Sequence, residues 1–102
     1  MALVDDAAYP PGKVPDPDLS RLMFKFGILP EQRIRFTMRI RTSEQVANLG
    51  ETVSEFKTKL PLIMTDMWPD EEIEKMYLAM NWTSVWQHAR DRAEEQREQT
   101  KV

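Results

Sequence analysis

The sequence has no cysteine and only one histidine among its 102 residues. The absence of cysteine excludes disulfides, thiolate zinc sites and cysteine nucleophiles. A metal site needs three or four convergent ligands, so we expect His88 to be a surface residue. The acidic stretch that begins at Asp66 lacks the glycine and the alternating ligands of a calcium loop. No glycine-rich phosphate loop or pair of nucleophile and base is present either. We therefore expect no enzymatic activity, no metal and no cofactor.

Long apolar runs are also missing. The longest candidate, residues 60–64, contains Pro61 and is far shorter than the roughly 20 residues that span a bilayer. Asp5 and Asp6 stand where a secretory signal carries basic residues. These features predict a soluble, intracellular (cytoplasmic) protein without a membrane segment.

Charged side chains are numerous, and they are distributed unevenly along the chain. Residues 21–41 contain six basic side chains and one acidic side chain, whereas residues 42–76 contain three basic and eight acidic ones. The net charge of the whole chain is −3. This pattern indicates either that the basic and the acidic segment attract one another within one fold, or that they form two faces for two partners.

Proline is concentrated at the start of the chain. Four of the seven prolines lie within residues 1–17, and closely spaced prolines favour extended backbone. We interpret residues 1–17 as a proline-rich extended arm, which is either a mobile tail or a segment that lies along a partner or its own domain. Residues 18–102 then form a single helical domain, with a charged helix end over residues 90–102.

Helix start and stop signals predict an all-α fold, a small domain of four or five helices behind the arm. Asp16 and Pro17 suit the start of a helix that Gly27 ends. Thr42 and Thr52 each precede a Gln or Glu by three residues, which is the pattern of a capping box. Further signals predict that Gly50 ends the short third helix, that Pro61 ends or kinks the fourth, and that Trp68 before Pro69 is extended.

Residues 33–41 alternate polar and apolar side chains and so resemble a half-buried strand. A helix is favoured because Pro30 and Glu31 make a good first turn and the flanking segments are helical. A lone strand would leave its backbone groups without partners. On a helix, Arg35 and Arg39 would be neighbours one turn apart.

The last helix begins near Pro69 or Asp70 and carries two apolar stripes, displaced from one another around the helix. The first stripe consists of Ile73, Met76, Tyr77 and Met80. The second consists of Trp82, Trp86, Ala89 and Ala93. Residues 81–84 are a possible break between them.

Residues 18–60 resemble the sterile-alpha-motif-like and helix-hairpin-helix class of small helical domains. The similarity is carried by the Gly27-Ile28 turn, by Arg33, Phe36 and Ile40, and by residues 42–49, TSEQVANL. DNA-binding hairpins of this class hold a phosphate on a glycine-containing turn, whereas the corresponding turn here, residues 40–42, has no glycine. The resemblance therefore implies the fold but not phosphate binding.

Two groups of residues are candidates for partner binding: the arginines Arg33, Arg35, Arg39 and Arg41, and the tryptophans Trp68 and Trp82. Guanidinium groups suit carboxylate and phosphate recognition, although the same arginines also fit a solvated face or a face docked on the acidic start of the last helix. Tryptophan is enriched at interfaces, and we expect Trp86 to be internal and Trp68 or Trp82 to be partly exposed. We expect a non-catalytic protein-protein interaction module, a small subunit or adaptor of a larger assembly. The alternative is a nucleic-acid-associated regulator that uses the basic 33–41 face.

Overall fold

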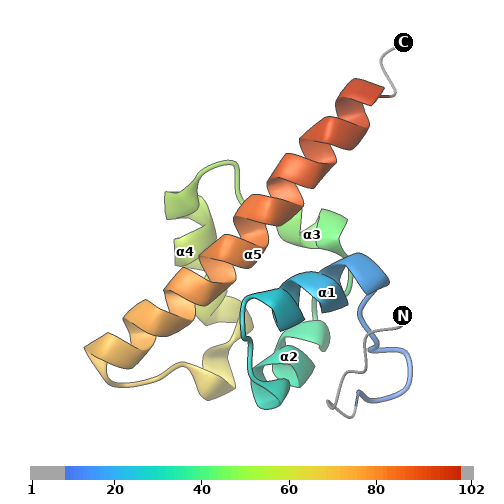
Figure 1. Cartoon of the computed structure of the whole chain (residues 1–102). Coiled ribbons are helices and arrows are strands. Elements are labelled where there is room, and N and C mark those ends of the chain that lie inside the picture. Colours follow the sequence, from blue (N-terminus) through green and yellow to red (C-terminus); the bar gives the residue numbers. More distant parts are fainter. Residues whose placement is uncertain (1–8, 100–102) are drawn as a thin grey trace.

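Five α-helices and one short 3₁₀ helix follow one another along residues 9–99, the part of the chain that this computed structural model describes (Figure 1). They are α1 (Pro17–Lys25), α2 (Pro30–Thr37), α3 (Ser43–Ala47), α4 (Val53–Ile63), the 3₁₀ helix η1 (Thr65–Met67) and α5 (Glu72–Gln99). No strand occurs within these residues. The all-α prediction is confirmed, and the strand alternative for residues 33–41 is excluded.

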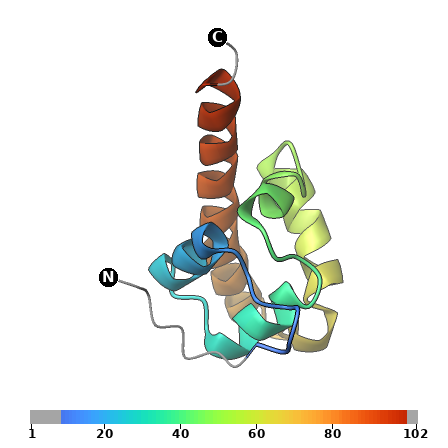
Figure 2. The ribbon, with the colours of Figure 1, turned by 90° about the vertical axis from the view of Figure 1, so that its right-hand side faces the viewer.

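Helix α5 organises the fold by packing on α1, α3 and α4. One side of it supplies core residues that are at most 5% exposed, namely Leu78, Trp82, Val85, Trp86 and Ala89. Both views of the ribbon show α5 continuing past the other helices at its C-terminal end (Figures 1 and 2). The possible break at residues 81–84 is absent, because Trp82 and Val85 hold these turns against the core.

The predicted boundaries of α1 are confirmed. The Asp16 carboxylate accepts a hydrogen bond from the Leu19 amide at 2.7 Å, and Pro17 occupies the first turn. At the other end Gly27 has a φ of 70°, the left-handed conformation that glycine adopts without strain. The Ile28 amide then donates to the Met23 carbonyl at 3.0 Å, which closes the helix end.

Helix α2 is shorter than predicted. It ends at Thr37, so Arg39 and Arg41 lie beyond it and Arg35 and Arg39 are not helical neighbours. The Arg39 amide donates to the Phe36 carbonyl, a bond that tightens the last turn, and Ile40 then packs against the core. Ile40, which is half-buried, therefore lies beyond the helix end.

Helix α3 begins with the predicted capping box, in which the Thr42 hydroxyl accepts from the Gln45 amide at 3.0 Å and the Gln45 side chain accepts from the Thr42 amide at 3.1 Å. Gly50 does not end this helix, which stops at Ala47. Gly50 is buried, and a Cβ there would lie 2.8 Å from the Phe56 amide nitrogen. Glycine is required at this position because two backbone segments approach closely.

Helix α4 forms half of its predicted capping box. The Thr52 hydroxyl accepts from the Glu55 amide at 3.2 Å, but the Glu55 carboxylate accepts from Glu51. Pro61 lies inside the last turn and removes one hydrogen bond of the helix, but the helix continues to Ile63 and so does not end at Pro61. Trp68 is extended, with φ −70° and ψ 121°, as predicted before Pro69.

The predicted arm is described from Tyr9 onward, so the interpretation of residues 1–8 lies outside the described residues. Residues 10–13 make a turn in which the Lys13 amide donates to the Pro10 carbonyl at 3.0 Å and Gly12 takes a φ of 76°. Pro15 is buried, and the Asp16 amide donates to the Arg41 carbonyl at 2.8 Å. The last residues of the arm therefore lie on their own domain.

Candidate interaction surfaces

The four candidate arginines do not form one face. Arg33 is only 4% exposed. Its guanidinium donates to the Ile28 carbonyl and lies 5.4 Å from the centre of the Phe24 ring. The structure therefore corrects the expectation for Arg33, whose side chain holds the α1–α2 connection and is not available to a partner.

Arg35 and Arg39 lie around a shallow hollow between α2 and the end of α4, which Met38 and Ile63 also line. We call Arg35 and Arg39, both exposed, the basic face. The Arg35 guanidinium lies 3.1 Å from the Asp66 carboxylate, and Arg39 donates to the Leu62 carbonyl at 3.0 Å. Part of the charge complementarity seen in the sequence is thus satisfied within the chain, through an exposed pair worth at most about 1 kcal/mol.

Arg41 is half-buried, and its side chain contacts the residues just before it in the chain. Its guanidinium donates to the Met38 carbonyl at 3.4 Å, and its backbone carbonyl accepts from Asp16. Arg41 therefore belongs to the contact between the arm and the α2–α3 connection.

The tryptophans divide between core and surface, and of Trp68 and Trp82 it is Trp68 that is partly exposed. Trp82 is fully buried and stacks on Phe36, with ring centroids 4.0 Å apart. The structure corrects the expectation that Trp82 contacts a partner, because no part of its ring reaches the surface. Trp68 is half-buried and packs against the core. Trp86 is internal, as predicted, at 3% exposed.

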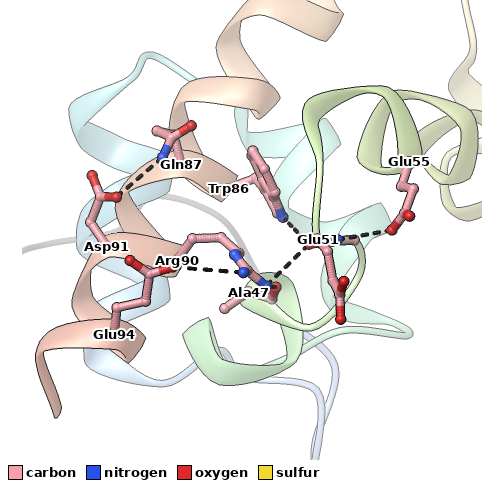
Figure 3. Close-up of polar contacts among 9 residues, drawn as sticks. Ala47, Glu51, Glu55, Trp86, Gln87, Arg90, Asp91 and Glu94 are labelled. Carbon is pink, nitrogen blue, oxygen red and sulfur yellow. Dashed lines mark hydrogen bonds and ion pairs between the residues drawn. The ribbon is translucent and has the colours of Figure 1, made fainter. Parts of the chain in front are cut away.

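Trp86 and Arg90 fasten α5 to the connection between α3 and α4. The Trp86 indole N–H donates to the Gly50 carbonyl at 3.2 Å, and Arg90 donates to the Ala47 carbonyl at 3.3 Å (Figure 3). The Trp86 ring also stacks on Phe56, with centroids 5.6 Å apart. This side of α5, which we call the inner face, holds the fold together.

The opposite side of α5 carries the first apolar stripe, and it faces solvent. Ile73, Met76, Tyr77 and Met80 are each between 53% and 63% exposed. We call these four residues the outer face. A rotation of about 100° per residue places their mean direction on the far side of the helix from Trp82 and Ala89. The sequence identified this stripe, but the reason to assign it to a surface is visible only once the inner face is known.

A groove runs along one edge of the outer face. Its α5 wall includes Glu74, Tyr77 and Asn81, and its other wall includes Leu29 and Met67. Leu29, which precedes α2, is 60% exposed. The apolar surface therefore continues from Tyr77 across the groove to Leu29.

The start of α5 adds a rim of acidic side chains to this surface. All are exposed, and they are Asp70, Glu71, Glu72 and Glu74. Glu72 pairs with Lys75 at 3.1 Å. The other three form no ion pair within residues 9–99, so their charge is directed to solvent.

No group of three potential metal ligands lies together in the described part of the chain. His88 is exposed beside Phe26, with ring centroids 4.9 Å apart. None of the described helices is both long enough and apolar enough to cross a bilayer.

Comparison with known proteins gives no match at a significant level, whether to a protein family, to a curated protein or to a solved structure.

Proposed function

We propose that this chain is a non-catalytic protein-protein interaction module, a small subunit or adaptor of a larger assembly, and that the outer face of α5 is its main contact surface. The observation that carries the proposal is the exposure of Ile73, Met76, Tyr77 and Met80 on the side of α5 that faces away from the core.

A helix with apolar residues on two opposite sides is typical of one that is covered on both sides. The inner face is covered by this chain, while each of the four residues of the outer face is more than half exposed. Contiguous exposed apolar surface of this kind marks interaction sites in soluble proteins. Tyr77 supplies an aromatic ring with a polar end, and Met76 and Met80 supply flexible side chains that adapt to a partner.

The alternative function, a nucleic-acid-associated regulator, receives less support. Phosphate binding draws on several cationic groups that face one surface. Here Arg33 is buried, and Arg35 is already paired with Asp66. The resemblance to sterile-alpha-motif-like domains remains a hypothesis about the fold.

The test begins with a displayed library of amphipathic helical peptides, selected for binding to the intact chain. Affinities of the selected peptides are then measured by fluorescence anisotropy for the chain and for two variants. Ile73→Ser/Tyr77→Ser alters the outer face. Leu62→Ser is the matched control, because Leu62 is 68% exposed but lies on α4.

We expect the outer-face variant to bind at least about tenfold more weakly, which corresponds to about 1.4 kcal/mol, and the Leu62→Ser control to bind as the parent chain does. Both variants should unfold within about 0.5 kcal/mol of the parent, because the altered residues are exposed. Binding that survives Ile73→Ser/Tyr77→Ser but is lost in Arg35→Gln/Arg39→Gln would contradict the proposal. A mobility shift with nucleic acid that depends on these arginines would favour the alternative.

A further inference from the structure

The acidic rim defines what kind of partner fits the outer face. Four of the five residues in 70–74 are acidic, and Glu72 and Glu74 flank Ile73 in the sequence. Acidic residues in a first turn interact favourably with the helix dipole, by about 0.3–1 kcal/mol each. Glu72 and Glu74 both lie in the first turn of α5, so this effect favours both of them. Glu74 differs in that it also lines the groove.

Glu74 and Tyr77 are one turn apart on α5, and both line the groove. A lysine or arginine that entered the groove would pair with the Glu74 carboxylate while its aliphatic stem covered the Tyr77 ring. Glu74 forms no ion pair with any described residue, so it is available to such a cation. The groove thus combines an apolar wall with a negative charge at the same place.

The outer face also has the dimensions of a helix-binding surface. Its four residues follow the spacing i, i+3, i+4 and i+7, which covers two helical turns or about 10 Å. An amphipathic helix buries apolar side chains of the same spacing in such a groove. Leu29 across the groove supplies the second wall.

A second copy of this chain is a poorer fit than a basic partner. Its net charge is −3, and its own outer face is bordered by the same acidic residues. In an antiparallel pairing of two outer faces, with Met76 of one copy opposite Tyr77 of the other, Glu72 and Glu74 would face Asn81 and Ala79. The acidic rim would then gain no positive partner.

We infer, on the basis of the proposed function, that the outer face binds a basic amphipathic helix of another protein, whose Lys or Arg side chains pair with Glu71 and Glu74. The apolar stripe provides most of the buried area. The acidic rim sets the charge and the orientation of the bound helix.

The test uses the peptide library described above, with the positions that flank its apolar residues randomised among Lys, Arg, Glu, Asp, Ser and Gln. Selection is carried out in parallel on the intact chain and on Glu71→Lys/Glu74→Lys. The matched control is Glu95→Lys/Glu98→Lys, which makes the same charge change at the same spacing on α5. These two residues are exposed and lie far along the helix from the outer face.

We expect Lys and Arg to be enriched on the parent chain and on the control, and Asp and Glu to be enriched on Glu71→Lys/Glu74→Lys. A basic peptide selected on the parent should bind this variant at least about tenfold more weakly. Sedimentation of each variant and its unfolding midpoint establish that the chains compared are folded and of the same size.

Three results overturn the inference in distinguishable ways. If the selected peptides bind through the outer face but show no preference for basic residues, the basic partner is contradicted and the proposed function stands. If no selected peptide depends on Ile73 and Tyr77 for binding, the basic partner and the proposed function are both contradicted. A dimer of the parent chain that Ile73→Ser/Tyr77→Ser dissociates would identify a second copy as the occupant, which also overturns the inference.

Discussion

Trp86 joins the inner face of α5 to the connection between α3 and α4. It combines burial, a stack on Phe56 and the hydrogen bond from its indole N–H to Gly50. We predict that Trp86→Ala lowers the free energy of unfolding by about 3–5 kcal/mol, the usual cost of emptying a core aromatic site. Urea denaturation measures this change. Tyr77→Ala, at an exposed aromatic of the same helix, is the control and should change stability by about 0.5 kcal/mol or less. An unchanged midpoint for Trp86→Ala would show that this face is not the core.

Gly50 illustrates a glycine that is needed for space and not for its backbone angles. We predict that Gly50→Ala costs about 1–3 kcal/mol, as overpacking does, because the added Cβ meets the Phe56 backbone. The shift of the Gly50 carbonyl should also perturb the Trp86 indole N–H signal in NMR spectra.

Gly27→Ala is the comparison for Gly50→Ala. It should cost about 1–2 kcal/mol through its left-handed φ, with open space around the added Cβ. The Trp86 indole signal should stay unchanged in this variant. An equal indole shift in the two variants would contradict the distinction between close approach and backbone strain.

At the scale of single elements, the sequence predicts helix boundaries well where they depend on local hydrogen bonds. Asp16, Gly27 and Thr42 each act as their residue types suggest. Prediction fails where packing decides. Residues 38–41 lie beyond the end of α2, and Ile40 among them packs on the core. This helix end cannot be deduced from a window of neighbouring residues. Pro61 was expected to end or to kink α4, and the helix continues past it to Ile63.

Asp16 connects two elements, since its carboxylate accepts from Leu19 at the start of α1 and from the Ser43 amide at 3.2 Å at the start of α3. We predict that Asp16→Ala costs about 1–2 kcal/mol, the upper part of the range for a lost cap. It should also accelerate hydrogen exchange at Ser43.

Asp18→Ala is the matched control on the same helix. Asp18 contributes only surface ion pairs with Arg21 and Arg92, so this change should cost less than about 1 kcal/mol. Unchanged exchange at Ser43 in Asp16→Ala would contradict the connection between α1 and α3.

At the scale of the whole molecule, α5 has two apolar faces, of which one is buried and the other is exposed. The sequence lists both stripes, but both satisfy the helical period, so periodicity alone does not say which one is buried. What decides is packing against elements far along the chain: Phe36 stacks on Trp82, and the α3–α4 connection receives Trp86. Packing also separates the candidate residues that the sequence grouped together. Arg35 and Arg39 are exposed, whereas Arg33 and Trp82 are internal.

The most direct test of the central claim is an NMR titration of the isotope-labelled chain with a peptide selected from the helical library. If the outer face of α5 is the contact surface, amide shifts should concentrate in residues 70–81 and in residues 27–32 across the groove. Shifts concentrated in residues 35–41 and 62–66 instead would place binding on the basic face and contradict the account.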